Sequence, residues 1–240
     1  MTSQELIRVL QKNQGMFYPV VPFDPSKDKL LSLDFTIGNK ELADDVLLHS
    51  DQFIRYINDK LNDAGARYGI GGYAEHRTVY SKSSVFDGNN PGDEPRRLHL
   101  GVDIWGKPHT AVIAPLDGIV HSFGFNNRPG DYGATIILTH ILDGLSFYTL
   151  YGHLSLNSIK NLSGGERIKG GEIFAEFGIP AENGGWPPHL HFQIILDINA
   201  WSGDYPGVCK YSEKEKWLAN SPDADLILGL NDYISQLLLS

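Results

Sequence analysis

The segment ILTHILDGLSFYTL, residues 137–150, decides the fold class of this chain of 240 residues. It consists of two apolar runs that contain β-branched and aromatic residues, and Asp143-Gly144 separates them. Such a dipeptide between two runs of this kind is typical of a tight turn that joins antiparallel strands. The segment therefore predicts a β-hairpin.

Similar short runs lie on both sides of the hairpin, between residues that form turns. In chain order they read RLHLGVDIW, AVIAP, GIVHSF, EIFAEFG and HLHFQIILD. Several strands at this spacing favour an antiparallel β core over the alternating strands and helices of a parallel sheet. We therefore predict a mainly β fold, α+β overall, in which an antiparallel sheet groove or sandwich forms the core and helical segments lie at both ends.

Helical patterns flank the β region on both sides. Thr2 and Glu5 fit a capping box at the start of a first helix, ahead of apolar residues at helical spacing. Further helices are expected over residues 40–64, 213–218 and 227–239. Ser50 or Asp51 can restart the pattern over residues 40–64 as a separately capped helix. The chain is thus expected to comprise a helical N-terminal extension that packs on the core (residues 1–85), a β domain (residues 86–210) and a C-terminal helical segment (residues 211–240).

The composition excludes several classes of partner and site. Twenty Lys and Arg residues against 29 Asp and Glu give a formal net charge of −9, so the chain lacks the basic surface of a protein that binds nucleic acid or anionic membranes. The single cysteine, Cys209, excludes an internal disulfide and a four-cysteine zinc site. The first residues lack a signal-peptide pattern, and no run of about eighteen apolar residues is present. We therefore expect a soluble, cytoplasmic protein with no nucleic-acid or membrane partner.

Two strand-like segments carry the residues of greatest chemical interest. In HLGVDI, the alternation of side chains places His99 and Asp103 on one face, and in HLHFQI it places His189 and His191 on one face. Three ligands from His and Asp, with water in the fourth position, describe a catalytic zinc site. Alone, each segment also fits polar residues on a solvated strand face. Because both histidines of HLHFQI point the same way, periodicity does not distinguish a ligand from a base.

Together with a third segment, Tyr151-Gly152-His153-Leu154, these strands resemble peptidase family M23, the zinc metallopeptidases of the LytM and lysostaphin type. That family carries H-x-x-x-D, x-H-L and H-x-H motifs in this order on an antiparallel β groove. The neighbouring segments APLDGIV, DYGATIILTH and PHLHFQI also fit the sequence pattern of the family. The resemblance covers about half of the chain, from roughly Arg96 to Asp197.

The resemblance implies a role for each of five residues. His99, Asp103 and His191 are the implied ligands of one zinc ion per chain, and His153 and His189 are the implied catalytic pair. One of the pair would assist the deprotonation of water, and the other would bond the oxyanion or protonate the leaving amine; the assignment between them stays open. The implied activity is that of a hydrolase, an endopeptidase or amidohydrolase type of metalloprotease. Zinc-activated water would cleave a peptide bond in a peptide or peptide-like substrate.

Three features depart from the family pattern, and two further histidines lie outside its motifs. Gln193 replaces the usual glutamate, which points to different contacts around the ligands. Trp186 either lines the groove or fixes a turn against the core, and His76 either reaches the groove or is an ordinary polar residue. The residues just before His99 include no tyrosine to stabilise an oxyanion. His140, at the end of a strand, is expected to make a structural hydrogen bond.

A rival function belongs to another class. Because the sequence shows no export signal, a cell-wall substrate fits poorly. The alternative is a non-catalytic or latent metal-binding or regulatory module that binds or acts on a soluble cytoplasmic peptide-like or amino compound. Degenerate members of the family usually lose ligands, whereas this chain keeps all five residues, which favours the enzyme.

Overall fold

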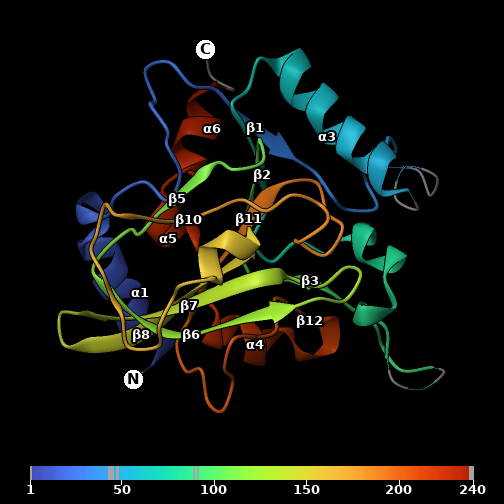
Figure 1. Ribbon diagram of the computed structural model, residues 1–240. Coiled ribbons are helices and arrows are strands. Elements are labelled where there is room, and N and C mark those ends of the chain that lie inside the picture. The colour runs from blue at the N-terminus through green and yellow to red at the C-terminus, as the bar shows by residue number, and fades with distance from the viewer. Residues whose placement is uncertain (1, 43–45, 47–48, 89, 91, 238–240) are drawn as a thin grey trace.

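The computed structural model describes residues 2–42, 46, 49–88, 90 and 92–237. The predicted hairpin is formed by strands β7 (Gly133–Leu142) and β8 (Leu145–Leu154). Asp143 and Gly144 join them with φ angles of 48° and 80°, the left-handed conformations that a two-residue turn of this kind requires. This hairpin forms part of the main sheet (Figure 1).

The main sheet has eight strands, of which β1 and β2 run parallel while the other neighbouring pairs are antiparallel. Besides the hairpin, its strands are β1 (Leu30–Leu33), β2 (Tyr68–Gly71), β4 (Val102–Trp105), β6 (Gly118–Asn126), β9 (Arg167–Ile168) and β11 (His189–Ile195), in the spatial order β1-β2-β4-β11-β8-β7-β6-β9. Two smaller pairs are formed by β5 (Ala111–Ile113) with β10 (Ile173–Glu176) and by β3 (Arg96–His99) with β12 (Val208–Lys210). The prediction of a mainly β, largely antiparallel fold with helices at its ends is confirmed.

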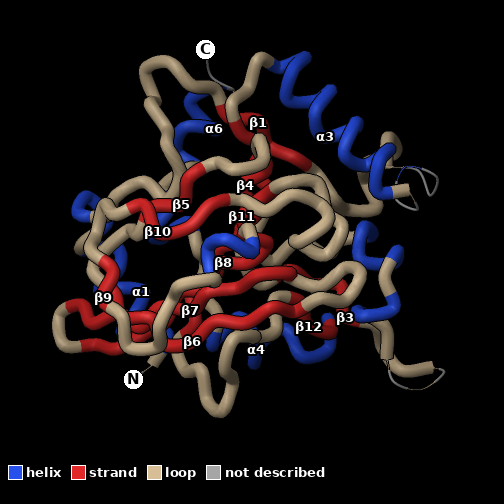
Figure 2. The backbone as a smooth tube through the Cα atoms, viewed as in Figure 1, coloured by secondary structure: helices blue, strands red, loops and turns tan. Residues whose placement is uncertain are grey.

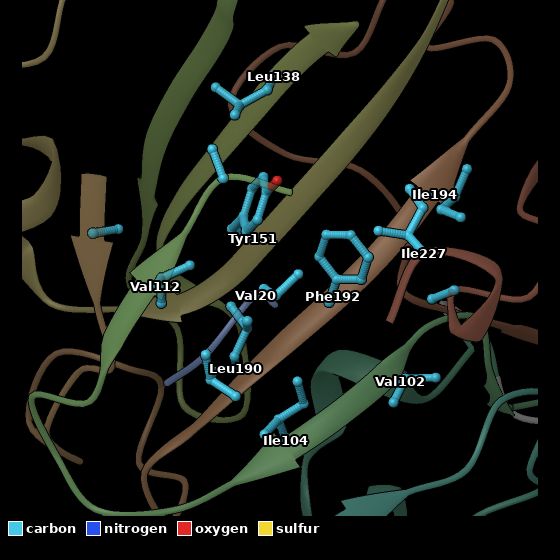
Figure 3. Close-up of a cluster of buried hydrophobic side chains, with 14 of the residues drawn as sticks. Val20, Val102, Ile104, Val112, Leu138, Tyr151, Leu190, Phe192, Ile194 and Ile227 are labelled. Carbon is cyan, nitrogen blue, oxygen red and sulfur yellow. The ribbon is translucent and has the colours of Figure 1, made fainter. Parts of the chain in front are cut away.

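The alternation of β11 separates the apolar core from the polar face of the sheet. Leu190, Phe192 and Ile194 point into a cluster of buried apolar side chains contributed by neighbouring strands (Figure 3). The alternate residues, which include both histidines of the H-x-H motif, therefore face the opposite side. Every residue of β11 is buried, so the polar face of this strand is also covered by other parts of the chain.

The helices lie around the strand layer (Figure 2). Helix α1 (Ser3–Lys12) has the expected capping box, and α3 (Ser50–Ala64) begins at Ser50 and ends where Gly65 adopts a φ of 58°. At its C-terminal end the chain forms α4 (Lys214–Asn220), α5 (Asp225–Leu228) and α6 (Asn231–Leu237). None of the described helices combines the length and apolar character needed to cross a bilayer.

Two helix predictions need correction. The expected helix over residues 40–64 does not begin at Lys40, because residues 40–42 form turns and a bend; residues 43–45 and 47–48 lie outside the described part of the chain. The expected helix over residues 227–239 is divided, because Gly229, with a φ of 59°, ends α5 before α6 begins. Residues 238 and 239 of that prediction also lie outside the described part.

The segment HLGVDI does not form one continuous strand. The chain leaves β3 at His99 and enters β4 at Val102, and the two strands pair with different partners. Gly101 lies in the bend, where an added Cβ atom would be only 2.6 Å from the carbonyl oxygen of Phe192 and 2.8 Å from the His191 ring. The bend therefore depends on glycine, because it brings the backbone directly against β11.

Candidate metal centre

The register of the sheet brings the predicted site residues together. On β11, His191 lies opposite Asp103 of β4 on one side and opposite Gly152 of β8 on the other. Directly opposed residues project to the same face of a sheet, so the side chains of His191 and Asp103 meet. His153 follows Gly152, and His99 approaches from the end of β3. Three motifs that are far apart in sequence thus converge on the polar face of β11.

Three candidate ligand atoms form a small triangle. His99 Nε2 lies 2.9 Å from His191 Nδ1 and 3.2 Å from Asp103 Oδ1, and His191 Nδ1 lies 3.0 Å from Asp103 Oδ1. All three residues are buried, with at most 3% of each exposed. Among the residues that the structure describes, these three form the group whose ligand atoms lie close enough together to hold a metal ion.

Each ligand candidate uses its remaining polar atom to bond the protein. His99 Nδ1 donates to the carbonyl oxygen of Gly72 at 2.9 Å, and His191 Nε2 donates to Gln193 Oε1 at 2.9 Å. The other oxygen of Asp103, Oδ2, accepts a hydrogen bond from Arg77. In a neutral imidazole one nitrogen carries the proton and the other a lone pair, so these contacts direct both lone pairs into the triangle. Gln193, which replaces the usual glutamate of the family pattern, thus contacts a candidate ligand.

The donor set fits a zinc ion. A tetrahedral ion with bonds of about 2.0–2.1 Å holds its ligand atoms about 3.3–3.4 Å apart, close to the 2.9–3.2 Å seen between these atoms. Two nitrogen lone pairs and a carboxylate oxygen at such distances repel one another unless a cation lies between them. Two imidazoles and one carboxylate without a thiolate also match the preferences of Zn²⁺.

The electrostatics keep the ligands in their binding forms. Burial and the nearby Arg77 lower the pKa of His99 to about 4, which leaves its ring neutral at pH 7. Burial alone would raise the pKa of Asp103, but His99 and Arg77 hold that pKa well below its usual range. A neutral imidazole and an ionised carboxylate are the forms that bind metals.

His153 and His189 lie side by side next to this triangle, with ring centroids 4.1 Å apart. Their Nδ1 atoms donate to the backbone carbonyls of Asn183 and Pro187, respectively, at 2.9 and 2.8 Å. Burial is the main cause that lowers the pKa of His189 to about 4 and that of His153 well below its usual range. Trp105 stacks on the ring of His189 at 3.9 Å and fixes its plane. Both rings are therefore neutral and held in place, with Nε2 carrying the lone pair.

A cavity of about 200 Å³ gives access to these groups. Its lining includes Asp103, His191 and the two paired imidazoles, together with the aromatic rings of Tyr80, Phe86, Trp105, Tyr132 and Trp186. Both interpretations of Trp186 therefore apply: its ring lines the cavity and also packs in a buried apolar cluster with Phe53 of α3. His76 is exposed and faces Tyr211, so it does not reach the cavity.

Sequence reasoning missed three residues of this site. Arg77 is fully buried beside Asp103, Glu75 pairs with it, and Tyr132 lines the cavity. The Tyr132 hydroxyl is buried without a hydrogen-bond partner among the described residues, and its ring lies 5.2 Å from that of His191. Tyr132 belongs to the quoted run DYGATIILTH, so a signal for it was present. Nothing in the pattern around Arg77 distinguishes it from a surface arginine.

Comparisons with known proteins agree with the geometry. Residues 97–202 match the sequence profile of peptidase family M23. An uncharacterized metalloprotease of Haemophilus influenzae is 30% identical over 154 residues, which cover 61% of this chain and 30% of that protein. An L-Ala–D-Glu endopeptidase of Bacillus subtilis is 30% identical over 138 residues, which cover 54% of this chain and 40% of that protein. The matched segment thus spans less than half the length of either relative.

Among solved structures, the catalytic domain of the antimicrobial peptidase lysostaphin from Staphylococcus simulans is similar at 24% identity, with a TM-score of 0.38 over 68% of this chain and 97% of that domain. The profile match includes the H-x-x-x-D, x-H-L and H-x-H motifs. Residues 97–202 of this chain therefore belong to peptidase family M23.

Proposed function

We propose that this chain is a zinc-dependent peptidase that hydrolyses a peptide bond. The observation that carries the proposal is the convergence of three ligand atoms, 2.9–3.2 Å from one another, beside two neutral imidazoles that line one cavity with Asp103 and His191. His99, Asp103 and His191 would hold one zinc ion. When bound, zinc would polarise the scissile carbonyl and make water acidic enough to attack at neutral pH.

His153 and His189 would move the proton. Because Nδ1 of each ring donates to a backbone carbonyl, Nε2 is the nitrogen that is left to accept a proton. A ring that takes the proton of the attacking water becomes a donor at the same nitrogen, and it can then protonate the leaving amine. The lowered pKa values of both rings favour the neutral, accepting form before the reaction.

The substrate that we propose is a peptide or a peptide-like compound. Membership of residues 97–202 in a peptidase family supports this class, and the name of the Bacillus subtilis relative supports a peptide bond between an L- and a D-residue as a first probe. The Tyr132 hydroxyl, which has no partner among the described residues, is available as a donor to the carbonyl oxygen of such a substrate.

A pair of variants separates metal binding from catalysis. Purified wild-type protein is expected to bind about one zinc per chain, and His191→Ala should lose it. His153→Asn should keep the zinc, because His153 is not a ligand, and asparagine tolerates the φ of 61° at this position. Its rate of hydrolysis of a peptide with an L-Ala–D-Glu bond, or of a peptide-library substrate cleaved by the wild type, should fall by about 10²–10⁴-fold.

Two results would contradict the proposal. A wild-type chain that binds no zinc would exclude the site, and full activity in His153→Asn would exclude the proton role of His153. Zinc binding without hydrolysis of any member of the peptide library would instead favour the non-catalytic or latent module.

A further inference from the structure

Arg77 is the largest fully buried side chain in the described part of the molecule and carries a charge that the proposed reaction does not use. It lies just ahead of the 3-10 helix at Thr78–Lys82, outside the region that matches the family. A buried guanidinium is costly unless its donors are paired. The partners of its donors therefore indicate why the charge is there.

The guanidinium contacts two carboxylates on two of its edges. Its Nε donates to Glu75 Oε2 at 2.7 Å, and Nη1 donates to Asp103 Oδ2. The rings of Phe35 and Tyr80 lie 5.1 and 5.8 Å from its central carbon and enclose it. Burial alone would lower the pKa of Arg77, but its charged and polar neighbours raise it, so the charge persists.

One further contact extends the influence of Arg77 to a second ligand. Its Nη2 donates to the carbonyl oxygen of Gly72 at 3.2 Å, and the same oxygen accepts the Nδ1 proton of His99 at 2.9 Å. An arginine side chain has a planar set of five donors, which allows it to hold groups in fixed relative positions. Arg77 thus touches Asp103 directly and the partner of His99 through Gly72.

The contact with Asp103 has a consequence for coordination. A carboxylate beside a metal can bind it through one oxygen or through both. Because Oδ2 of Asp103 is bonded to Arg77, only Oδ1 faces the other two ligands. A catalytic zinc site needs a position left open for water and substrate, and a second carboxylate oxygen would occupy it.

We infer that Arg77, held by Glu75, is a positioning residue that restricts Asp103 to one-oxygen coordination and so keeps a coordination position open. This inference rests on the zinc site of the proposed function. It also assigns a role to Gly72, Glu75 and Arg77, which lie outside the family region: they complete the surroundings of the proposed zinc site. A merely structural arginine would support folding but would not determine how Asp103 binds an ion.

Direct metal titration tests the inference with three variants and a control. Arg77→Met keeps an apolar stem against Phe35 and Tyr80 but removes every donor, Arg77→Lys keeps the charge without the planar fork, and Glu75→Gln weakens the support of Arg77. The control is Arg97→Met, because the Arg97 side chain is also largely covered, 13% exposed, and paired with a carboxylate, Asp87. Circular dichroism and thermal melts establish that each chain is folded.

Zinc affinity, measured by competition with a chromophoric chelator, should fall by about 10–100-fold in Arg77→Met and less in Arg77→Lys and Glu75→Gln. Co²⁺ added in place of Zn²⁺ reports the coordination number through its visible absorption. We expect weaker, shifted bands in Arg77→Met, as a further oxygen enters the coordination shell. Arg97→Met should match the wild type in both measurements.

The outcomes distinguish this inference from the proposed function. A folded Arg77→Met with wild-type zinc affinity and an unchanged cobalt spectrum would overturn the inference and leave the proposed function intact. If Arg77→Met does not fold, the same result in Arg77→Lys and Glu75→Gln would overturn it. A wild-type chain that binds neither ion would overturn both.

Discussion

At the scale of single residues, each candidate ligand has two polar atoms with separate tasks. One atom of His99, Asp103 or His191 faces the triangle, and the other bonds Gly72, Arg77 or Gln193 respectively. The outer bond selects the tautomer or the oxygen that is available to an ion. The surrounding protein therefore determines the donor set before any ion binds.

The sequence predicted the five candidate residues that the structure brings together, but it did not predict the groups that orient them. Histidines spaced two apart on a strand and a histidine four residues before an aspartate leave a local pattern, and the resemblance assigned their roles. The contact of Arg77 with Asp103 joins positions 26 residues apart and depends on how the loop after β2 runs beside β3. No local periodicity in the sequence predicts such a contact.

His140 lies away from the candidate metal centre and, unlike the ligand histidines, bonds the protein through both of its ring nitrogens. As predicted, it makes structural hydrogen bonds: its Nδ1 donates to the carbonyl of Asp117 at 2.8 Å, and its Nε2 lies 2.7 Å from Thr149 Oγ1. Burial is the main cause that lowers its pKa from 6.5 to about 4. The unfolded chain therefore binds this proton as the pH falls through 6.5, whereas the folded chain excludes it until about pH 4.

A pH series of unfolding free energies tests this assignment. The contribution of neutral His140 should be complete above pH 6.5 and should shrink by about 3 kcal/mol as the pH falls to 4. The difference in unfolding free energy between wild type and His140→Gln, measured by urea denaturation with a chelator present, should therefore decrease over this range. A difference that does not change with pH would contradict the assignment.

At the scale of elements, the register of the strands determines which side chains come together at the site. Because His191 lies opposite both Asp103 and Gly152, a shift of β11 by one residue would turn its histidines to the apolar side. The sequence predicts most of these strands through their apolar runs. It does not predict that HLGVDI bends between β3 and β4, because that bend follows from contact between Gly101 and β11.

The hairpin turn between β7 and β8 gives a direct test at this scale. Gly144 has a φ of 80°, and an added Cβ would meet nothing within 4 Å. Gly144→Ala should therefore destabilise the fold by about 1 kcal/mol through backbone strain alone, as measured by urea denaturation. Gly164→Ala is the matched control, because its Cβ would also meet open space but its φ is not positive. Equal losses in both variants would show that the turn conformation is not the cause.

At the scale of the whole molecule, the first third of the chain and the family region share one sheet and one core. Strand β2 pairs with β4, and Leu6 of α1 packs in the same buried cluster as Phe192 of β11. The sequence predicts the two main helices of this part but not β1 and β2. Each of these strands has only four residues, and two of the four in β2 are glycines, so no clear apolar alternation marks it.

Because of this shared sheet and core, we predict that the family region alone neither folds cooperatively nor forms a complete metal centre. A fragment of residues 86–240 would lose β2, the neighbour of β4, and would uncover apolar residues such as Ile104 that now pack against residues 1–85. It would also lose Gly72 and Arg77, the partners of two ligand candidates. We expect this fragment to show no cooperative thermal unfolding and to bind zinc far more weakly than the full chain. Residues 1–85 supplied as a separate chain should restore part of both properties. A fragment that melts cooperatively with the zinc affinity of the full chain would show instead that the metal centre is complete within residues 86–240, since exposed apolar surface and missing ligand contacts each act against that result.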